Sequence, residues 1–120
     1  MTQQEMKERT KRFALETIRL CEGLPKGVTT QAIAAQLVRS GMSIAANYRS
    51  ACRGRSRAEF VSKIGIAEEE ADETSLWLEL LRDAGLVPER SVDKLLIEAE
   101  ALTKILAATT SVRNAFRNDI

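Results

Sequence analysis

The fold is decided by a heptad pattern in residues 60–81, FVSKIGIAEEEADETSLWLELL. Apolar or small residues recur there at alternating spacings of four and three, which is typical of a helix that packs along a seam against other helices. The seam residues are Phe60, Ile64, Ala67, Ala71, Thr74, Leu78 and Leu81. The period-two alternation of a half-buried strand is absent from the whole chain. The pattern therefore predicts an all-α protein.

The following segment repeats this pattern, and short breaks delimit the helices. Its seam residues are Val92, Leu95, Ala99, Leu102, Leu106, Thr109 and Phe116. Clusters containing glycine lie at residues 23–27, 53–56 and 84–88. They predict helices near residues 4–22, 29–52, 57–84 and 88–116. Because such short loops force each helix to run antiparallel to the one before, we expect an antiparallel up-down-up-down four-helix bundle, with residues 1–120 as one domain.

Helix start and stop signals accompany the breaks. Ser56, with Glu59 three residues later, forms a capping box for the third helix. Gly85 followed by Pro88 predicts the end of the third helix and the start of the fourth. Thr29 or Thr30 is expected to cap the second helix.

The composition excludes several classes of enzyme and membrane protein. The chain contains no histidine, so catalytic triads, HExxH zinc sites and Glu-x-x-His di-iron sites are excluded. Cys21 and Cys52 are isolated and are interpreted as small buried residues. No apolar stretch approaches the length of a membrane span, and the first five residues are polar. We expect a cytoplasmic protein with no metal, cofactor or small-molecule substrate.

The second helix carries apolar residues on more than one face. One face holds Ile33, Leu37, Ile44, Tyr48 and Ala51, whereas Val38, Met42, Ala45 and Ala46 lie on others. Because three neighbouring helices can cover only one side, we predict that the second face packs against another subunit. The alternative is an alanine-rich helix that tolerates two hydrophobic residues on its surface.

The charges are divided unequally between the two halves of the chain. Residues 1–57 contain 11 Lys or Arg and 4 acids, whereas residues 58–120 contain 7 and 13. Lys7, Arg9, Lys11 and Arg12 crowd the start of the first helix, and Arg49, Arg53, Arg55 and Arg57 surround the end of the second. The second group is the candidate nucleic-acid-binding set, since arginine suits phosphates. The alternatives are pairing of basic with acidic helices inside the bundle, or a solvated loop without a partner.

One residue of an acidic run is predicted to be buried. Glu68–Glu70, Asp72 and Glu73 are mostly expected at the surface, but Glu70 falls inside the apolar arc of its helix. A buried carboxylate needs a cation or hydrogen-bond donors, for which arginines of the second helix, Ser40 and Asn47 are candidates. A structural polar network is the favoured interpretation. The alternative is a catalytic acid, or a divalent metal held by the carboxylates.

Four stretches together resemble a known family. They are RSGMSIAANYR (39–49), RSRAEF (55–60), EEADE (69–73) and WLELL (77–81). The chain resembles the bacterial four-helix bundle proteins related to those encoded in intervening sequences of 23S ribosomal RNA genes. Many members read Asn-Ile-Ala-Glu-Gly where this chain continues from Asn47 as Tyr48-Arg49-Ser50-Ala51, as in one branch of the family.

The resemblance implies an assembly and a set of shared residues. Relatives form pentameric rings without an established enzymatic activity, and a distant relative, the accessory protein of diversity-generating retroelements, binds nucleic acid and a reverse transcriptase. Arg39, Ser40, Asn47 and Glu70 are candidates for a shared signature. We therefore expect a non-catalytic, self-associating bundle that binds RNA or DNA. The alternative functions are a protein–protein scaffold or adaptor without nucleic-acid binding, and an enzyme that uses the carboxylates of the third helix with a metal.

Overall fold

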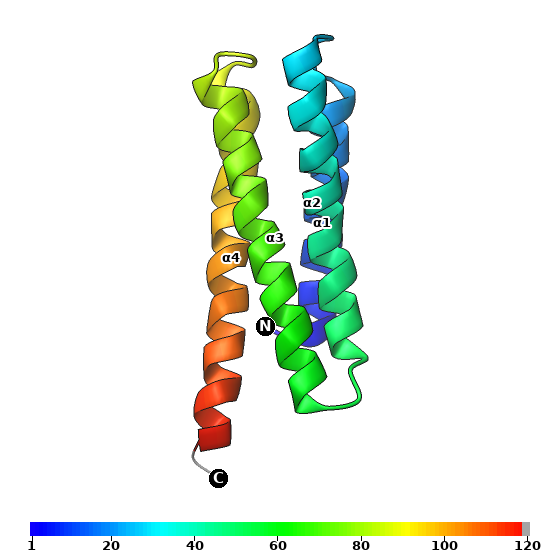
Figure 1. The fold of residues 1–120 in the computed structure, drawn as a ribbon, viewed down its shortest axis with the longest axis vertical. Coiled ribbons are helices and arrows are strands. Elements are labelled where there is room, and N and C mark those ends of the chain that lie inside the picture. The colour runs from blue at the N-terminus through cyan, green and yellow to red at the C-terminus, as the bar shows by residue number, and fades with distance from the viewer. Residues whose placement is uncertain (119–120) are drawn as a thin grey trace.

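Four α-helices form an antiparallel bundle (Figure 1). They are α1 (Gln3–Glu22), α2 (Val28–Cys52), α3 (Arg57–Asp83) and α4 (Glu89–Asn118). This computed structural model describes the backbone of residues 1–118 and the side chains of residues 1–110, and residues 1–118 contain no strand. The predicted all-α, up-down-up-down architecture is confirmed, with every helix end within two residues of its expected position.

The predicted seams form the hydrophobic core. All seven seam residues of α3 are buried, as are the α4 seam residues from Val92 to Leu106. Thr109 is half-buried, and the side chain of Phe116 lies outside the described residues. No helix in the described part of the chain is long and apolar enough to cross a membrane.

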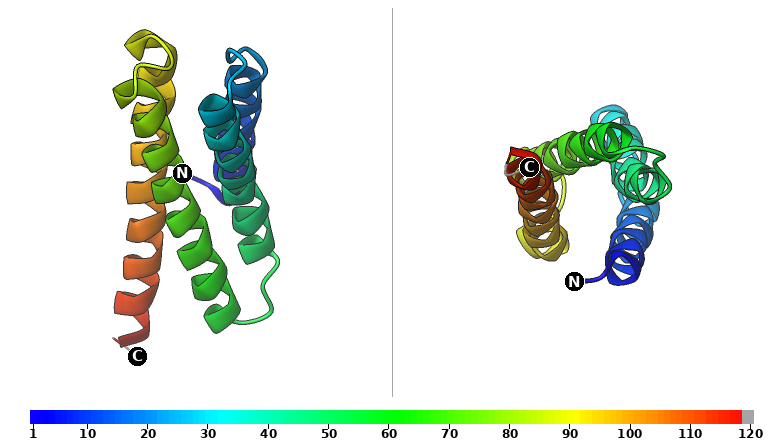
Figure 2. Two further views of the ribbon diagram at one scale, coloured as in Figure 1. Left: turned by 45° about the horizontal axis from the view of Figure 1, so that its top comes forward. Right: turned by 90° about the horizontal axis from the view of Figure 1, so that it is seen from below.

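The helices follow one another around an open arc when the bundle is seen end-on (Figure 2). Contact between α1 and α4 is the least extensive of the four helix–helix contacts. An ion pair joins these two helices, because the guanidinium of Arg9 donates to both carboxylate oxygens of Glu98 at 2.7 and 2.8 Å. One cation of the basic half therefore pairs with an acid of the acidic half across the open side of the bundle.

The two helix boundaries of α3 follow the predicted signals. The Ser56 hydroxyl accepts from the Glu59 N–H at 3.1 Å, and the Glu59 carboxylate reaches back to the Arg55 N–H at 3.1 Å. At the other end, Gly85 adopts a φ of 69°, and the Leu86 N–H donates to the carbonyl of Leu81. This is a Schellman ending, in which the left-handed position favours glycine.

The predicted threonine cap of α2 is wrong. The helix begins at Val28, so its N-cap is Gly27, and no side chain makes a cap hydrogen bond there. Thr29 and Thr30 already lie inside the first turn, and Thr30 is buried. Their hydroxyls are therefore past the position from which a side chain caps a helix.

Close packing between α1 and α2 depends on a glycine. A Cβ atom built on Gly41 would lie 2.9 Å from Cγ2 of Thr17, closer than side chains approach each other. The absence of a side chain at Gly41 therefore lets α1 and α2 approach closely at Thr17.

Candidate functional site

Four cations from two helices surround one open depression, here called the basic depression. It is lined by Lys7 and Lys11 on α1, Arg49 on α2 and Arg53 directly after α2, together with Gln4 and Glu8, and its volume is about 410 Å³. Each pair has the spacing of four residues that places side chains on one helix face. Antiparallel packing brings the start of α1 beside the end of α2, so the two pairs meet.

These four cations are available to an external anion. None of them forms an ion pair within 4.0 Å among residues 1–110, and Glu8 accepts instead from the side-chain amide of Gln4 at 3.3 Å. Arg49 lies in the last turn of α2 and Arg53 is its C-cap residue. Phosphate oxygens suit such a site, because guanidinium and ammonium groups form charge-assisted hydrogen bonds with them.

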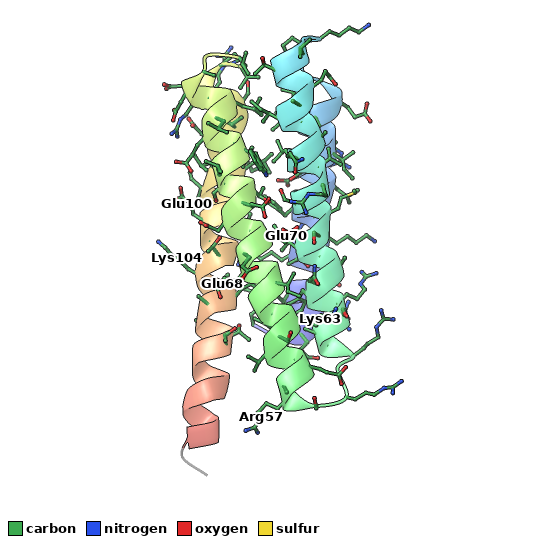
Figure 3. All side chains as sticks on the ribbon, viewed as in Figure 1. Arg57, Lys63, Glu68, Glu70, Glu100 and Lys104 are labelled. Carbon is green, nitrogen blue, oxygen red and sulfur yellow. The ribbon has the colours of Figure 1, made fainter. Side chains whose placement is uncertain are left out.

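The structure separates the four predicted nucleic-acid-binding arginines. Arg49 and Arg53 line the basic depression, whereas Arg55 and Arg57 are exposed at the α2–α3 connection and the start of α3 and do not line it. Figure 3 shows Arg57 at the end of the bundle, beyond the main body of α2. Lys7 and Lys11 are additional members that the sequence did not connect to the arginines, because only the packing of α1 on α2 brings them together.

The basic depression continues into an apolar surface between the same two helices. Lys11, Arg49 and Arg53 also line a second depression, whose other walls include Leu15 and Met42. Through Ile18 this depression continues into a third one, which reaches toward the α1–α2 connection. We call the second and third depressions together the α1/α2 groove.

The groove contains the second apolar face of α2. Met42 is 44% exposed and Leu15 on α1 is 41% exposed, whereas Leu37 and Ile44 on the core face of α2 are fully buried. Within one chain, the second face is thus left without a covering helix. That another subunit covers it stays a prediction.

One cysteine at the groove is protected from ionisation. Burial, together with a smaller effect of the neighbouring Glu22 carboxylate, raises the pKa of the Cys21 thiol to about 11. The Sγ atom lies 3.8 Å from the carbonyl oxygen of Ala34. Because the thiolate is the reactive form, Cys21 is a poor nucleophile at neutral pH.

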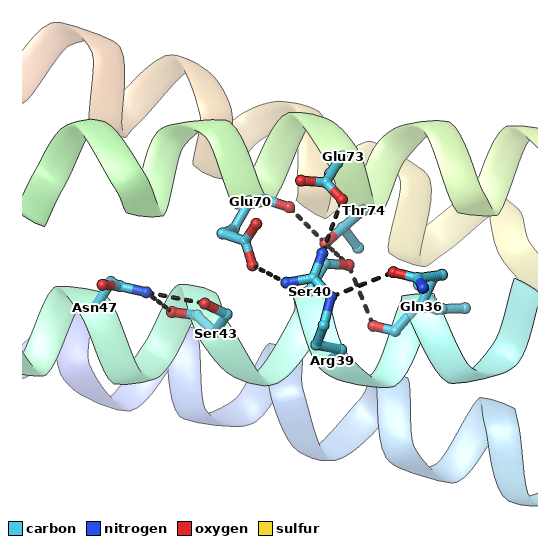
Figure 4. Close-up of polar contacts among 9 residues, drawn as sticks. Gln36, Arg39, Ser40, Ser43, Asn47, Glu70, Glu73 and Thr74 are labelled. Atoms are coloured by element: carbon cyan, nitrogen blue, oxygen red, sulfur yellow. Dashed lines mark hydrogen bonds and ion pairs between the residues drawn. The ribbon is translucent and has the colours of Figure 1, made fainter.

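Arg39 links α2 to α3 through two carboxylates (Figure 4). Its Nη1 donates to Glu70 at 2.8 Å, its Nη2 donates to Glu73 at 2.8 Å, and its Nε donates to the amide oxygen of Gln36 at 3.2 Å. The side chain of Glu70 is 10% exposed and that of Arg39 is 49% exposed. The carboxylate inside the apolar arc therefore has a cationic partner, as buried charges require.

The other two members of the predicted network are placed differently. The hydroxyl of Thr74 lies 2.8 Å from that of Ser40 and 2.7 Å from the carbonyl oxygen of Glu70, so Ser40 joins the same α2–α3 contact. The Asn47 amide instead donates to the carbonyl and hydroxyl oxygens of Ser43, each at 2.9 Å. Asn47 lies two turns beyond Arg39 and forms a separate, local contact within α2.

The carboxylates of α3 do not converge on a metal site. Among the described residues, no group of three or more His, Cys, Asp or Glu side chains is arranged to hold a metal ion. Glu70 and Glu73 both bind Arg39.

Comparison with known proteins places this chain in a family. The family model described as 23S rRNA-intervening sequence protein matches residues 2–108. The chain belongs to this family. The predicted resemblance is confirmed, and the matched region contains the basic depression, the α1/α2 groove and the Arg39–Glu70 contact.

A solved structure supports the same assignment. A protein of unknown function from the S23 ribosomal protein family of Bacteroides thetaiotaomicron is 32% identical, with a TM-score of 0.82 over 92% of this chain and 99% of that chain. Among curated proteins, none matches this chain. Neither the family description nor the description of the neighbour names an enzymatic activity.

Proposed function

We propose that this protein is a non-catalytic, self-associating bundle that binds the phosphate backbone of RNA or DNA at the basic depression. The observation that carries the proposal is the convergence of Lys7, Lys11, Arg49 and Arg53 around one surface, without ion-pair partners among residues 1–110. Cations held together in this way favour a polyanion over a single small ion, because each can take a different phosphate.

The chemistry of the depression favours binding that does not depend on base sequence. Aromatic residues make up 4% of the chain, and none lines the basic depression. Stacking on bases is therefore not a main source of affinity. Four phosphate contacts predict that the logarithm of the association constant falls with the logarithm of salt concentration with a slope of about −3.6 on duplex DNA.

Self-association is supported by the exposed apolar side chains of the α1/α2 groove. Exposed apolar surface that is continuous and bordered by polar residues is typical of a protein–protein interface. The resemblance implies a pentamer for such an assembly.

Fluorescence anisotropy with a labelled 30-base-pair DNA duplex tests the proposal. A slope of about −3.6 predicts about 150-fold weaker binding at 200 mM than at 50 mM salt. We expect Arg49→Glu/Arg53→Glu to abolish binding at the lower salt concentration. The control Arg90→Glu/Lys104→Glu makes the same change in net charge at exposed positions of α4 outside the depression. Binding that ignores salt, or equal losses in both variants, would contradict the proposal.

The contribution of the α2–α3 connection is measured in the same way. Arg55→Glu/Arg57→Glu weakens binding further if nucleic acid extends beyond the depression, and leaves it unchanged if the four cations suffice.

The exposed apolar groove also favours a second candidate function, a scaffold that docks another protein. Affinity capture from a native lysate treated with nuclease distinguishes the two functions. A protein partner that survives the nuclease and is lost in Met42→Glu supports the scaffold.

A further inference from the structure

The outer face of α3 carries an exposed stripe of mixed apolar and acidic residues. Ile66, Leu76 and Leu80 are 38%, 46% and 39% exposed. Glu69 and Glu73 lie between them, and the positions 66, 69, 73, 76 and 80 have the alternating spacing of three and four that marks one helix face. We call these five residues the α3 stripe.

The α1/α2 groove has the same periodicity. On α2 its walls include Val38, Met42, Ala45 and Arg49, again spaced by four and three residues. Across the groove, Leu15 is exposed on α1. Side chains with this spacing on two adjacent helices form a track into which a third helix packs lengthwise.

The charges of the two surfaces are complementary. Lys11, Arg49 and Arg53 line one end of the groove, whereas the α3 stripe carries the exposed carboxylate of Glu69 and that of Glu73, which also binds Arg39 of its own chain. The other end of the groove is lined by Lys26 and Glu22, so the groove as a whole is net cationic. Contact between two grooves would therefore bring surfaces of like net charge together, and contact between two stripes would bring carboxylates together. Either arrangement costs free energy, whereas groove against stripe pairs opposite charges.

The stripe that fills the groove must belong to another molecule. Within one chain, α3 packs on α2 through the side that carries Glu70 and Thr74, and its apolar stripe residues stay exposed. We infer that the α1/α2 groove of one copy binds the α3 stripe of a second copy, a heterologous contact that rests on the proposed self-association. Because Lys11, Arg49 and Arg53 also line the basic depression, assembly is measured without nucleic acid.

The inference is tested by mixing two variants, each of which lacks one half of the contact. Sedimentation velocity at about 100 μM of each chain measures assembly, and far-UV circular dichroism verifies that both variants fold. Met42→Glu places a carboxylate in the groove opposite the acidic stripe, and Leu76→Lys places a cation in the stripe opposite the basic groove. Each variant alone should sediment as a monomer. Their mixture should form a 1:1 heterodimer, because one copy retains an intact stripe and the other an intact groove.

The control is Ile97→Lys, since Ile97 is 68% exposed on α4 and lies outside both surfaces. It should assemble like the unmodified chain. A zero-length carbodiimide, applied to a mixture of unlabelled and ¹⁵N-labelled unmodified chains, should join Lys11 to Glu69 or Glu73 between copies.

The outcomes separate failure of the inference from failure of the proposed function. An unmodified chain that is monomeric overturns self-association itself. An oligomer that persists in Leu76→Lys but is lost in Met42→Glu overturns the inference alone, since the groove then meets a different surface. Absence of both the heterodimer and the cross-link between copies also overturns it, whereas either product supports it.

Discussion

Replacing Arg39 with methionine should destabilise the protein more than replacing Glu70 with glutamine, although both changes remove the same ion pair, in which the Nη1–Oε2 distance is 2.8 Å. Arg39→Met retains the apolar stem but leaves the 10%-exposed Glu70 carboxylate without its cation. An uncompensated buried charge costs about 3 to 5 kcal/mol, and residual exposure reduces our expectation to about 2 to 3 kcal/mol. Glu70→Gln should cost only about 0.5 to 1.5 kcal/mol, because Arg39 keeps Glu73 and Gln36 and is half-exposed to water.

Urea unfolding at pH 7 measures the free energy of unfolding of both variants. The transition is monitored by the fluorescence of the single tryptophan, Trp77, and by far-UV circular dichroism. The double variant Arg39→Met/Glu70→Gln completes a double-mutant cycle and should recover part of the loss in Arg39→Met, since no unpaired carboxylate remains at position 70. A larger loss in Glu70→Gln than in Arg39→Met, or losses below about 0.5 kcal/mol in both, would refute a buried, Arg39-dependent carboxylate.

Packing and burial also determine the effects of changes at Leu78, Gly41 and Cys21. Leu78→Ala, at a fully buried seam position, should lower the free energy of unfolding by about 2 to 5 kcal/mol in the same urea titration, and a loss below about 1 kcal/mol would place Leu78 outside the core. Gly41→Ala should lower the free energy of unfolding by about 1 to 3 kcal/mol through overpacking. In the control Gly65→Ala, the added Cβ would meet nothing within 4 Å, and the free energy of unfolding should rise by about 0.5 to 1 kcal/mol. Equal effects of the two changes on thermal stability would count against the close α1–α2 packing. The folded protein favours the neutral Cys21 thiol. The contribution of this thiol to the free energy of unfolding is therefore lost as the pH rises toward the raised pKa of about 11. In a Cys52→Ser variant, the alkylation rate of Cys21 should keep rising about tenfold per pH unit between about pH 8 and 10, and a plateau near the ordinary thiol value of about 8.5 would be inconsistent with this burial.

The fold was predictable because local signals and the core agree. The heptad of residues 60–81 identified every buried seam position of α3, and Ser56 and Gly85 marked its ends through local backbone chemistry. The start of α2 was the exception. A threonine caps only if the helix begins just after it, and this helix begins before Thr29.

The candidate site was predictable only in part, because it depends on how the helices are aligned. Helix geometry identified Glu70 as buried, but choosing Arg39 as its partner required the register between α2 and α3. The sequence shows two basic clusters, but it does not show that Lys7 and Lys11 meet Arg49 and Arg53 while Arg9 turns to Glu98 on α4.

The continuity of the basic depression with the α1/α2 groove is likewise a product of packing between helices. The second face of α2 was visible in the sequence through Val38 and Met42. Its counterpart on α1, with Leu15 and Ile18, becomes part of the same surface only once the two helices pack against each other.

The central claim is that the second apolar face of α2 is covered by another copy of the chain. Light scattering coupled to size-exclusion chromatography, without nucleic acid, measures this directly. Coverage of this face by another copy predicts a molar mass that is a multiple of 13.3 kDa for the unmodified chain and a fall to 13.3 kDa for folded Met42→Glu. A mass of 13.3 kDa for the unmodified chain across its accessible concentration range would contradict it.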